Sequence, residues 1–186
     1  MPNRVAIFGG SFNPVHVAHQ LVAVYVRETQ PVDEVWFVPT YQHPFGKPLA
    51  PFEDRVAMCE LAAAPLGAKV SRAEEELAHR PGFVASRTLD LVEHLAAQGH
   101  ALRLVIGSDI IAETPKWHRW DLIAALAPPI VIGRTGHPHA DTIDMPEVSS
   151  TRIRALLASG DAAVGALLPA SVLRYIAARH LYAAPP

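Results

Sequence analysis

The chain has 186 residues, of which 50% are hydrophobic and 18% are charged, so it can bury a sizeable core and lacks the composition of a disordered protein. At roughly 150 residues per domain, this length predicts a single domain over residues 1–186, with a helical C-terminal part over about residues 150–186. Lys and Arg number 16 against 18 Asp and Glu, and no long basic run is present, which argues against a nucleic-acid partner.

The cellular setting is predicted from cysteine usage and hydropathy. Cys59 is the single cysteine, so the chain can form neither an intramolecular disulfide nor a cysteine zinc site. The first residues lack the pattern of a secretory signal, and the longest apolar stretches are too short to span a bilayer. We therefore expect a cytoplasmic protein without a membrane partner. The sequence gives no oligomeric state.

Short β-branched runs alternate with longer helical patterns along the chain. The runs cover residues 5–8, 35–39, 69–71, 102–106 and 130–132. Apolar residues at three- and four-residue spacing cover residues 17–29, 52–64 and 86–98 between them. This alternation predicts an α/β fold, a parallel sheet with helices on both faces.

Loops and shorter elements complete the prediction. Prolines interrupt residues 39–51, which predicts an irregular loop at the ligand-binding edge of the sheet. Residues 133–138 form a similar loop, and residues 141–147 are predicted as a short edge strand. Helix-start residues at 149–151 and a last helix over residues 171–178 follow.

A first candidate site follows the first strand. Gly9 and Gly10 would permit a tight turn and let backbone amides approach a ligand closely. His16 and His19 are three residues apart at the start of the next helix, so they share one face beside the positive end of its dipole. This order of strand, turn and helix favours a polyphosphate site over the structural alternative, in which the histidines only cap or solvate the helix.

A second candidate site lies about 130 residues later. Ser149, Ser150 and Thr151 supply hydroxyl groups and open amides at a helix start, and Arg154 could reach back over them with its guanidinium group. An ordinary helix cap with a surface arginine is the alternative for this segment alone.

Both segments carry a family resemblance. Residues 16–19 resemble the HxGH signature of the nucleotidyltransferase superfamily, with Ala18 in place of Gly and Asn13 where Asp is more usual. Residues 148–154 are similar to the ISSTxIR signature of nicotinate and nicotinamide mononucleotide adenylyltransferases. The resemblance implies a Rossmann-like sheet of the nucleotidyltransferase type, in which both motifs converge on one triphosphate.

Intermediate segments resemble nicotinate-nucleotide adenylyltransferases in the family's order, over about residues 4–180. Residues 43–47 resemble its PPHK loop, although His and Lys are not adjacent here, and residues 86–92 resemble SYTIDTL with Arg87 and Leu91 as departures. Residues 106–109, 115–120 and 133–137 stand where the family has IGAD or IGSD, PKWY and RPGY.

The resemblance implies an adenylyltransferase that joins ATP to nicotinate mononucleotide, giving deamido-NAD and pyrophosphate, with Mg²⁺ bound by ATP and water and no metal site of the protein's own. The catalytic residues it implies are His16, His19, Lys47 and Arg154. Those for ATP are Gly9, Gly10, Ser11, Phe12, His16, His19, Gly107, Asp109, Ser149, Ser150, Thr151 and Arg154. Those for the acceptor, whose flat ring and anionic groups call for an aromatic plane and cations, are Lys47, Thr88, Trp117 and Arg134.

Two of these regions have structural alternatives. Asp109 could accept hydrogen bonds from ribose hydroxyls or could cap a helix. Trp120 is predicted as a core anchor of a short helix rather than a ligand contact. The remaining histidines show no ligand spacing and are predicted mostly as surface residues.

Other functions stay open at this point. Nicotinamide mononucleotide or pantetheine phosphate could be the acceptor, a cytidylyltransferase would use the same histidine signature, and the sequence does not separate the two pyridine mononucleotides. A class I tRNA synthetase is disfavoured, since the chain has no KMSKS-like loop and no room for a tRNA-binding body. A catalytically weak nucleotide sensor, with Ala18 damaging the site, is the alternative from another class.

Overall fold

The computed structural model describes residues 2–42, 46, 48–85, 87–137, 139 and 142–183. Its centre is a parallel sheet with the strand order β3-β2-β1-β4-β5-β6, which confirms the predicted Rossmann-like α/β fold. The strands, in sheet order, are β3 (Lys69–Val70), β2 (Glu34–Pro39), β1 (Arg4–Gly10), β4 (Ala101–Gly107), β5 (Pro129–Arg134) and β6 (Asp144–Met145). The strand order reverses between β1 and β4, where open parallel sheets bind ligands beyond the carboxyl ends of their strands.

Alternating side chains of the strands supply two separate cores. In β1, Val5 and Ile7 belong to one buried cluster, whereas Ala6 and Phe8 face the other. In β4, Leu104 faces the first of these clusters and Val105 the second. This pattern is why the strands read as continuous apolar runs, since a parallel sheet is covered on both faces.

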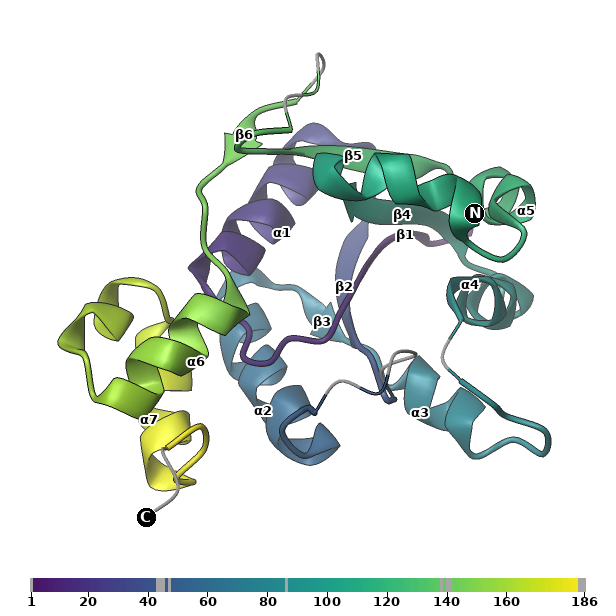
Figure 1. Ribbon diagram of the computed structural model, residues 1–186. Helices are drawn as coiled ribbons and strands as arrows, with labels where there is room; N and C mark the ends of the chain where they lie inside the picture. Colours follow the sequence, from purple (N-terminus) through teal and green to yellow (C-terminus); the bar gives the residue numbers. More distant parts are fainter. Residues whose placement is uncertain are drawn as a thin grey trace.

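Helices cover both faces, as Figure 1 shows. One face carries α1 (Val17–Thr29) and α2 (Phe52–Ala63). The other carries α3 (Ala73–Ala78), α4 (Thr88–Ala97) and α5 (Trp120–Leu126). No helix within the described ranges is long and apolar enough to cross a membrane.

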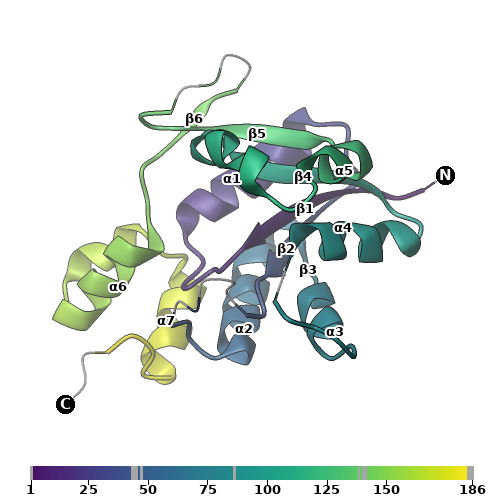
Figure 2. The same cartoon turned by 45° about the vertical axis from the view of Figure 1, so that its right-hand side comes forward.

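The C-terminal part is helical, as predicted. It consists of α6 (Ser150–Ser159), the 3-10 helix η3 (Ala162–Ala166) and α7 (Ala170–Ala178). In Figures 1 and 2, α7 lies beside α2, and α6 lies near the carboxyl end of β1. This placement brings the second sequence motif to the same end of the sheet as the first.

The predicted elements differ from the structure mainly at short segments. Helix α1 has the predicted bounds, and α2, α4 and α7 lie within one or two residues of theirs. The edge strand predicted over residues 141–147 contracts to β6, in the part of that range that the structure describes. Helices α3 and α5 and the 3-10 helices η1 (Ala64–Leu66), η2 (Ser108–Lys116) and η3 were not predicted, because such short helices show little apolar periodicity.

Candidate active site

A cavity of about 460 Å³ lies at the carboxyl ends of β1 and β4, at the point where the strand order reverses. The first candidate region lines this cavity, and the second binds the loop after β1 beside it. Its walls include Gly9, Gly10, Ser11, His16, Ala18, His19, Thr88, Gly107, Asp109, Trp117 and Arg134. The structure thus gathers on one cavity residues that four separate segments of the chain supply.

The two glycines end β1 rather than forming the turn that the sequence predicted. Gly9 pairs with Val38 of β2, and the turn follows at residues 11–14, with Phe12 at a φ of +45°. A Cβ on Gly10 would lie 3.2 Å from the ring of Phe12, so a larger residue there would push that ring away by a few tenths of an ångström. A Cβ on Gly9 would meet open space, and this residue lines the cavity.

Phe12, predicted as an ATP contact, places its side chain in the core. Its ring lies edge-on to the ring of His19 at a centroid distance of 5.0 Å and packs against Phe37 at 5.4 Å. Phe12 is absent from the residues that line the cavity. Its side chain therefore supports the histidine from behind.

His16 and His19 stack face to face at the start of α1, with their ring centroids 3.7 Å apart and an interplanar angle of 23°. The backbone N–H of His16 donates a hydrogen bond to Nδ1 of His19 over 3.1 Å. Because Nδ1 of His19 is an acceptor, the proton of its neutral ring is on Nε2. Both side chains line the cavity.

The histidine pair is neutral in the free protein. Burial, with a smaller contribution from the positive charge of Arg134, lowers the pKa of His16 to about 4. Burial also lowers the pKa of His19 well below its usual value, with His16 and Arg134 as smaller causes. The pair therefore offers N–H donors rather than fixed positive charge until an anion binds.

Arg134 and Asp109 face each other across the ends of β5 and β4. The Nε atom of Arg134 lies 3.3 Å from Oδ1 of Asp109, which is otherwise without a hydrogen-bond partner in the described part of the chain. Ser108 accepts a hydrogen bond from the backbone N–H of Arg134 over 2.9 Å and so joins the two loops. Gly107 makes room for this pair, since a Cβ there would lie 2.2 Å from Oδ1 of Asp109.

Two of the residues predicted for the acceptor, Thr88 and Trp117, lie on the cavity wall contributed by α4 and the end of η2, and a third, Arg134, lines the cavity from the end of β5. Thr88 begins α4, and the ring of Trp117 lies edge-on to Trp120 at a centroid distance of 5.6 Å. Trp120 packs against the core of this face and does not line the cavity, in line with its predicted anchoring role. Lys47 lies outside the described residues.

The second motif reaches the outside of the loop after β1. Ser149 caps α6 by accepting a hydrogen bond from the backbone N–H of Arg152 over 3.2 Å. The Ser150 hydroxyl donates to the carbonyl oxygen of Pro14 over 2.9 Å, and Nη1 of Arg154 donates to that of Asn13 over 2.8 Å.

The rest of the motif stays on that outer side. Nη2 of Arg154 lies 3.3 Å from the hydroxyl of Thr151. None of Ser149, Ser150, Thr151 and Arg154 is among the residues that line the cavity. The two motifs are thus in contact, but the guanidinium group of Arg154 binds the loop backbone instead of extending over the pocket.

Two buried charged residues beside the site were missed by sequence reasoning. Glu74 of α3 lines the cavity, and its Oε2 accepts a hydrogen bond from the backbone N–H of Tyr41 over 3.0 Å. Arg55 of α2 is 1% exposed and donates to the carbonyl oxygen of Ser11, a cavity residue. Glu74 is hidden in a run of three glutamates, and Arg55 binds backbone atoms, so neither carries a sequence signal.

The comparisons with known proteins agree with this geometry. Residues 7–156 match the model of the cytidylyltransferase-like family. The parallel sheet, the glycine-ended first strand and the histidine pair at the strand-order reversal are thus those of a nucleotidyltransferase.

A protein of Anaeromyxobacter sp. (strain K) named "Probable nicotinate-nucleotide adenylyltransferase" is 52% identical over 96% of each chain. A protein of the same name from Myxococcus xanthus is 45% identical over 96% of this chain and 94% of its own. The chain belongs to the nicotinate-nucleotide adenylyltransferase family.

Solved structures confirm the fold. Plasmodium falciparum nicotinic acid mononucleotide adenylyltransferase complexed with NaAD superposes with a TM-score of 0.79 over 97% of each chain, at 20% identity. A structure described as a putative nicotinate-nucleotide adenylyltransferase from Vibrio parahaemolyticus gives a TM-score of 0.68 over 94% of this chain and 99% of that one, at 18% identity. The fold is thus confirmed by the solved structures, and the family resemblance drawn from the motifs is confirmed by the relatives at 52% and 45% identity.

Proposed function

We propose that the protein transfers the adenylyl group of ATP to the phosphate of nicotinate mononucleotide, giving deamido-NAD and pyrophosphate for NAD biosynthesis. One observation carries this proposal: the stacked imidazoles of His16 and His19 line the same cavity as Thr88 and Trp117. The cavity volume of about 460 Å³ lies in the range of small-molecule sites. The names of the relatives at 52% and 45% identity support the same reaction.

The reaction needs alignment more than it needs a base. An oxygen of the acceptor phosphate attacks the α-phosphorus of ATP, a new P–O bond forms, and the bond to the bridging oxygen of the leaving pyrophosphate breaks. The attacking oxygen is already anionic, so no side chain must remove a proton. Holding both phosphates in line and stabilising the leaving group then account for catalysis.

The histidine pair acts on the triphosphate. The Nε2–H of His19 is a donor fixed in direction, because the backbone N–H of His16 holds Nδ1 of the same ring. Such preoriented donors stabilise developing negative charge in a site that excludes water. A bound polyphosphate favours the charged imidazole, so the pair takes up a proton as ATP binds.

Other side chains place the two substrates. Gly9 leaves the end of β1 open toward the cavity, and Arg134 brings a positive charge to the far side of the site. Thr88 and the aromatic face of Trp117 provide the contacts that a pyridine ring with a carboxylate calls for. Arg154 contributes by holding the backbone of Asn13, and Lys47 remains a sequence-based proposal for the phosphates of both substrates.

Mg²⁺ would enter with ATP. Among the described residues, no three His, Cys, Asp or Glu side chains are grouped closely enough to hold a metal ion. Mg²⁺ commonly binds beside nucleotides through phosphate oxygens and water, and the proposal assigns it that position. When bound, Mg²⁺ neutralises charge on the phosphates. A cytoplasmic location is proposed because Cys59, the single cysteine of the sequence, can form no intramolecular disulfide.

The test is a comparison of pyrophosphate release from ATP and Mg²⁺ with nicotinate mononucleotide, nicotinamide mononucleotide and pantetheine phosphate, repeated with CTP. We expect the highest kcat/KM with ATP and nicotinate mononucleotide, and a loss of turnover when EDTA removes Mg²⁺. Preference for another acceptor would contradict the proposed substrate. Tight ATP binding without pyrophosphate from any acceptor would instead support the nucleotide sensor, for which Ala18 on the cavity wall is the structural argument.

A further inference from the structure

Arg55 lies at the centre of a buried polar cluster beside the cavity. Its guanidinium group donates to three backbone carbonyl oxygens from different segments. They are those of Ser11 at 2.9 Å, Ala50 at 3.0 Å and Tyr41 at 3.4 Å. Arg55 and these three carbonyl groups are called the Arg55 cluster below. Its acceptors follow β1 and β2, so one side chain joins the loops at the ends of two neighbouring strands.

The same backbone positions are held from a second side. Oδ1 of Asn13 accepts a hydrogen bond from the N–H of Ala50 over 3.0 Å, so both polar backbone groups of Ala50 are held by side chains. Tyr41 is held likewise, its N–H by Glu74 and its carbonyl oxygen by Arg55. Asn13 also accepts a hydrogen bond from the hydroxyl of Tyr182 over 2.8 Å.

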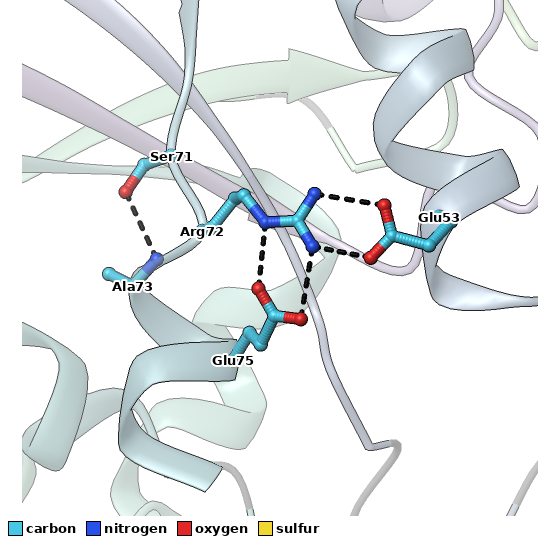
Figure 3. A network of polar contacts seen from close by, with 5 residues as sticks. All are labelled: Glu53, Ser71, Arg72, Ala73 and Glu75. Carbon is cyan, nitrogen blue, oxygen red and sulfur yellow. Dashed lines mark hydrogen bonds and ion pairs between the residues drawn. The ribbon is translucent and has the colours of Figure 1, made fainter. Parts of the chain in front are cut away.

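The helices that carry Arg55 and Glu74 are themselves joined. Arg72, just before α3, donates to Glu53 in the first turn of α2 and, from Nε over 2.7 Å, to Glu75 of α3 (Figure 3). Individually such partly exposed ion pairs stabilise a protein little, but here one guanidinium group bridges two carboxylates and fixes the two helices relative to each other.

Burying a guanidinium group is costly, and hydrogen bonds alone offset only part of that cost. Arg55 is 1% exposed, its pKa is lowered chiefly by burial, and its acceptors in the cluster are neutral carbonyl groups. The ring of Phe52, 5.3 Å away, adds a cation–π contact. An apolar side chain would leave these three carbonyl oxygens without a shared donor, so the cost of burying Arg55 is tied to holding three backbone positions at the ends of β1 and β2.

We propose, resting on the proposed function, that Arg55 is a positioning residue for adenylyl transfer. By fixing the carbonyl oxygens of Ser11, Tyr41 and Ala50, it holds the phosphate-side loop after β1 and the loop after β2 in one arrangement around the cavity. Ser11 and Thr40 line the cavity, and the N–H of Thr40 donates to the carbonyl oxygen of Gly10 over 2.9 Å. A shift of the Arg55 cluster therefore displaces cavity residues directly.

The test compares Arg55→Lys with Arg174→Lys, a change at an exposed arginine of α7. Lysine keeps the charge of Arg55 but cannot reach three carbonyl oxygens at once. We expect kcat per folded molecule to fall about 10- to 100-fold in Arg55→Lys, with a smaller change in KM, because a displacement of about 1 Å at a reacting centre has this effect. Arg174→Lys should behave as wild type. A kcat of Arg55→Lys within about twofold of wild type would overturn the proposal.

Asn13→Ala is the second variant, because it frees the N–H of Ala50 and leaves Arg55 in place. It decides the matter if Arg55→Lys does not fold: a lowered kcat supports the proposal, and an unchanged kcat overturns it. Amide hydrogen exchange over residues 10–13 and 48–51 measures how firmly the Arg55 cluster holds the backbone, independently of catalytic turnover. Exchange that is no faster in either variant would overturn the proposal, whereas an inactive wild-type protein with faster exchange in the variants would count against the proposed function alone.

Discussion

The imidazole rings of His16 and His19 are stacked with their centroids 3.7 Å apart, and the backbone N–H of His16 holds Nδ1 of His19. Two protonated imidazoles would repel each other at this distance, and both rings have lowered pKa values. The two imidazoles are therefore neutral in the free site, with their donors already oriented. We expect an imidazole to become protonated only when an anion binds.

Replacing His19 by alanine should remove one oriented donor from the leaving group. We expect kcat of His19→Ala to fall about 100- to 1,000-fold, the effect of losing one such donor in other preorganised sites, with a smaller change in KM. Pyrophosphate release measures this directly. His100→Ala is the control, because His100 lies at the amino end of β4 against Trp36. A folded His19→Ala protein with the full rate would contradict the assignment.

The lowered pKa of His16 predicts a loss of stability in mild acid. Above its ordinary pKa of 6.5, His16 is neutral in both the folded and the unfolded chain, so it adds no pH dependence there. As the pH falls from 6.5 toward about 4, the unfolded chain takes up a proton that the folded protein refuses, and folding becomes less favourable. This group alone lowers the free energy of unfolding by on the order of 2 kcal/mol between about pH 7 and pH 5.

Urea unfolding at those two pH values measures the loss, and His16→Gln supplies the comparison, because glutamine is polar but does not titrate. We expect the variant to lose less stability than wild type over the same interval. An identical pH dependence in the two proteins would show that His16 is not protonated on unfolding in this range.

The sequence predicts correctly those features that depend on residues close together in the chain. Helix α1 was predicted with its full bounds because apolar residues such as Val22 and Val26 recur at helical spacing. His16 and His19 were placed on one face of this helix by spacing alone, and the structure shows them stacked. The strands predicted over residues 5–8 and 102–106 follow from continuous apolar runs, and the structure extends them through Gly10 and Gly107.

The contacts that the sequence could not predict join distant segments through backbone atoms. Ser150 binds the carbonyl oxygen of Pro14, and Arg55 binds that of Ser11. Every residue has a backbone carbonyl group, so the residue types cannot show which one a side chain binds. Spacing placed Arg154 near the phosphate site, but only the fold decides that its guanidinium group meets the carbonyl of Asn13. The sequence motifs predicted that the histidine pair and residues 149–154 lie at one site, whereas the topology of the fold determines which of their atoms are in contact.

The hydrogen bond from Ser150 to Pro14 connects α6 with the loop that leads to the histidine pair. Ser150→Ala leaves that carbonyl oxygen without its donor, so we expect the free energy of unfolding to fall by about 1 kcal/mol and the KM for ATP to rise severalfold. Chemical denaturation and steady-state kinetics measure the two effects. The matched control is Ser159→Ala, whose hydroxyl binds only the carbonyl of Leu156 within the same helix. Equal effects on KM from both changes would argue against a link to the site.

Gly107 is predicted to matter for activity because of the ion pair beside it, not because of its backbone conformation. Its φ of −74° suits any residue, but a Cβ there would lie 2.2 Å from Oδ1 of Asp109 and 3.2 Å from Nε of Arg134. The end of the Asp109 side chain must then move away, and the 3.3 Å contact with Arg134 is lost. We expect Gly107→Ala to fold normally and to lower kcat/KM about tenfold, which corresponds to about 1.4 kcal/mol. Gly165→Ala is the control, because a Cβ there meets no atom within 4 Å.

A double-mutant cycle tests this explanation. If Gly107→Ala acts by displacing Asp109, adding it to Asp109→Ala should cause little further loss, because the side chain that it displaces is already gone. Additive losses in kcat/KM would mean that the methyl group instead obstructs the substrate itself. The cycle therefore separates a damaged ion pair from a blocked cavity, and only the first result agrees with Asp109 holding Arg134 at the cavity wall through their 3.3 Å contact.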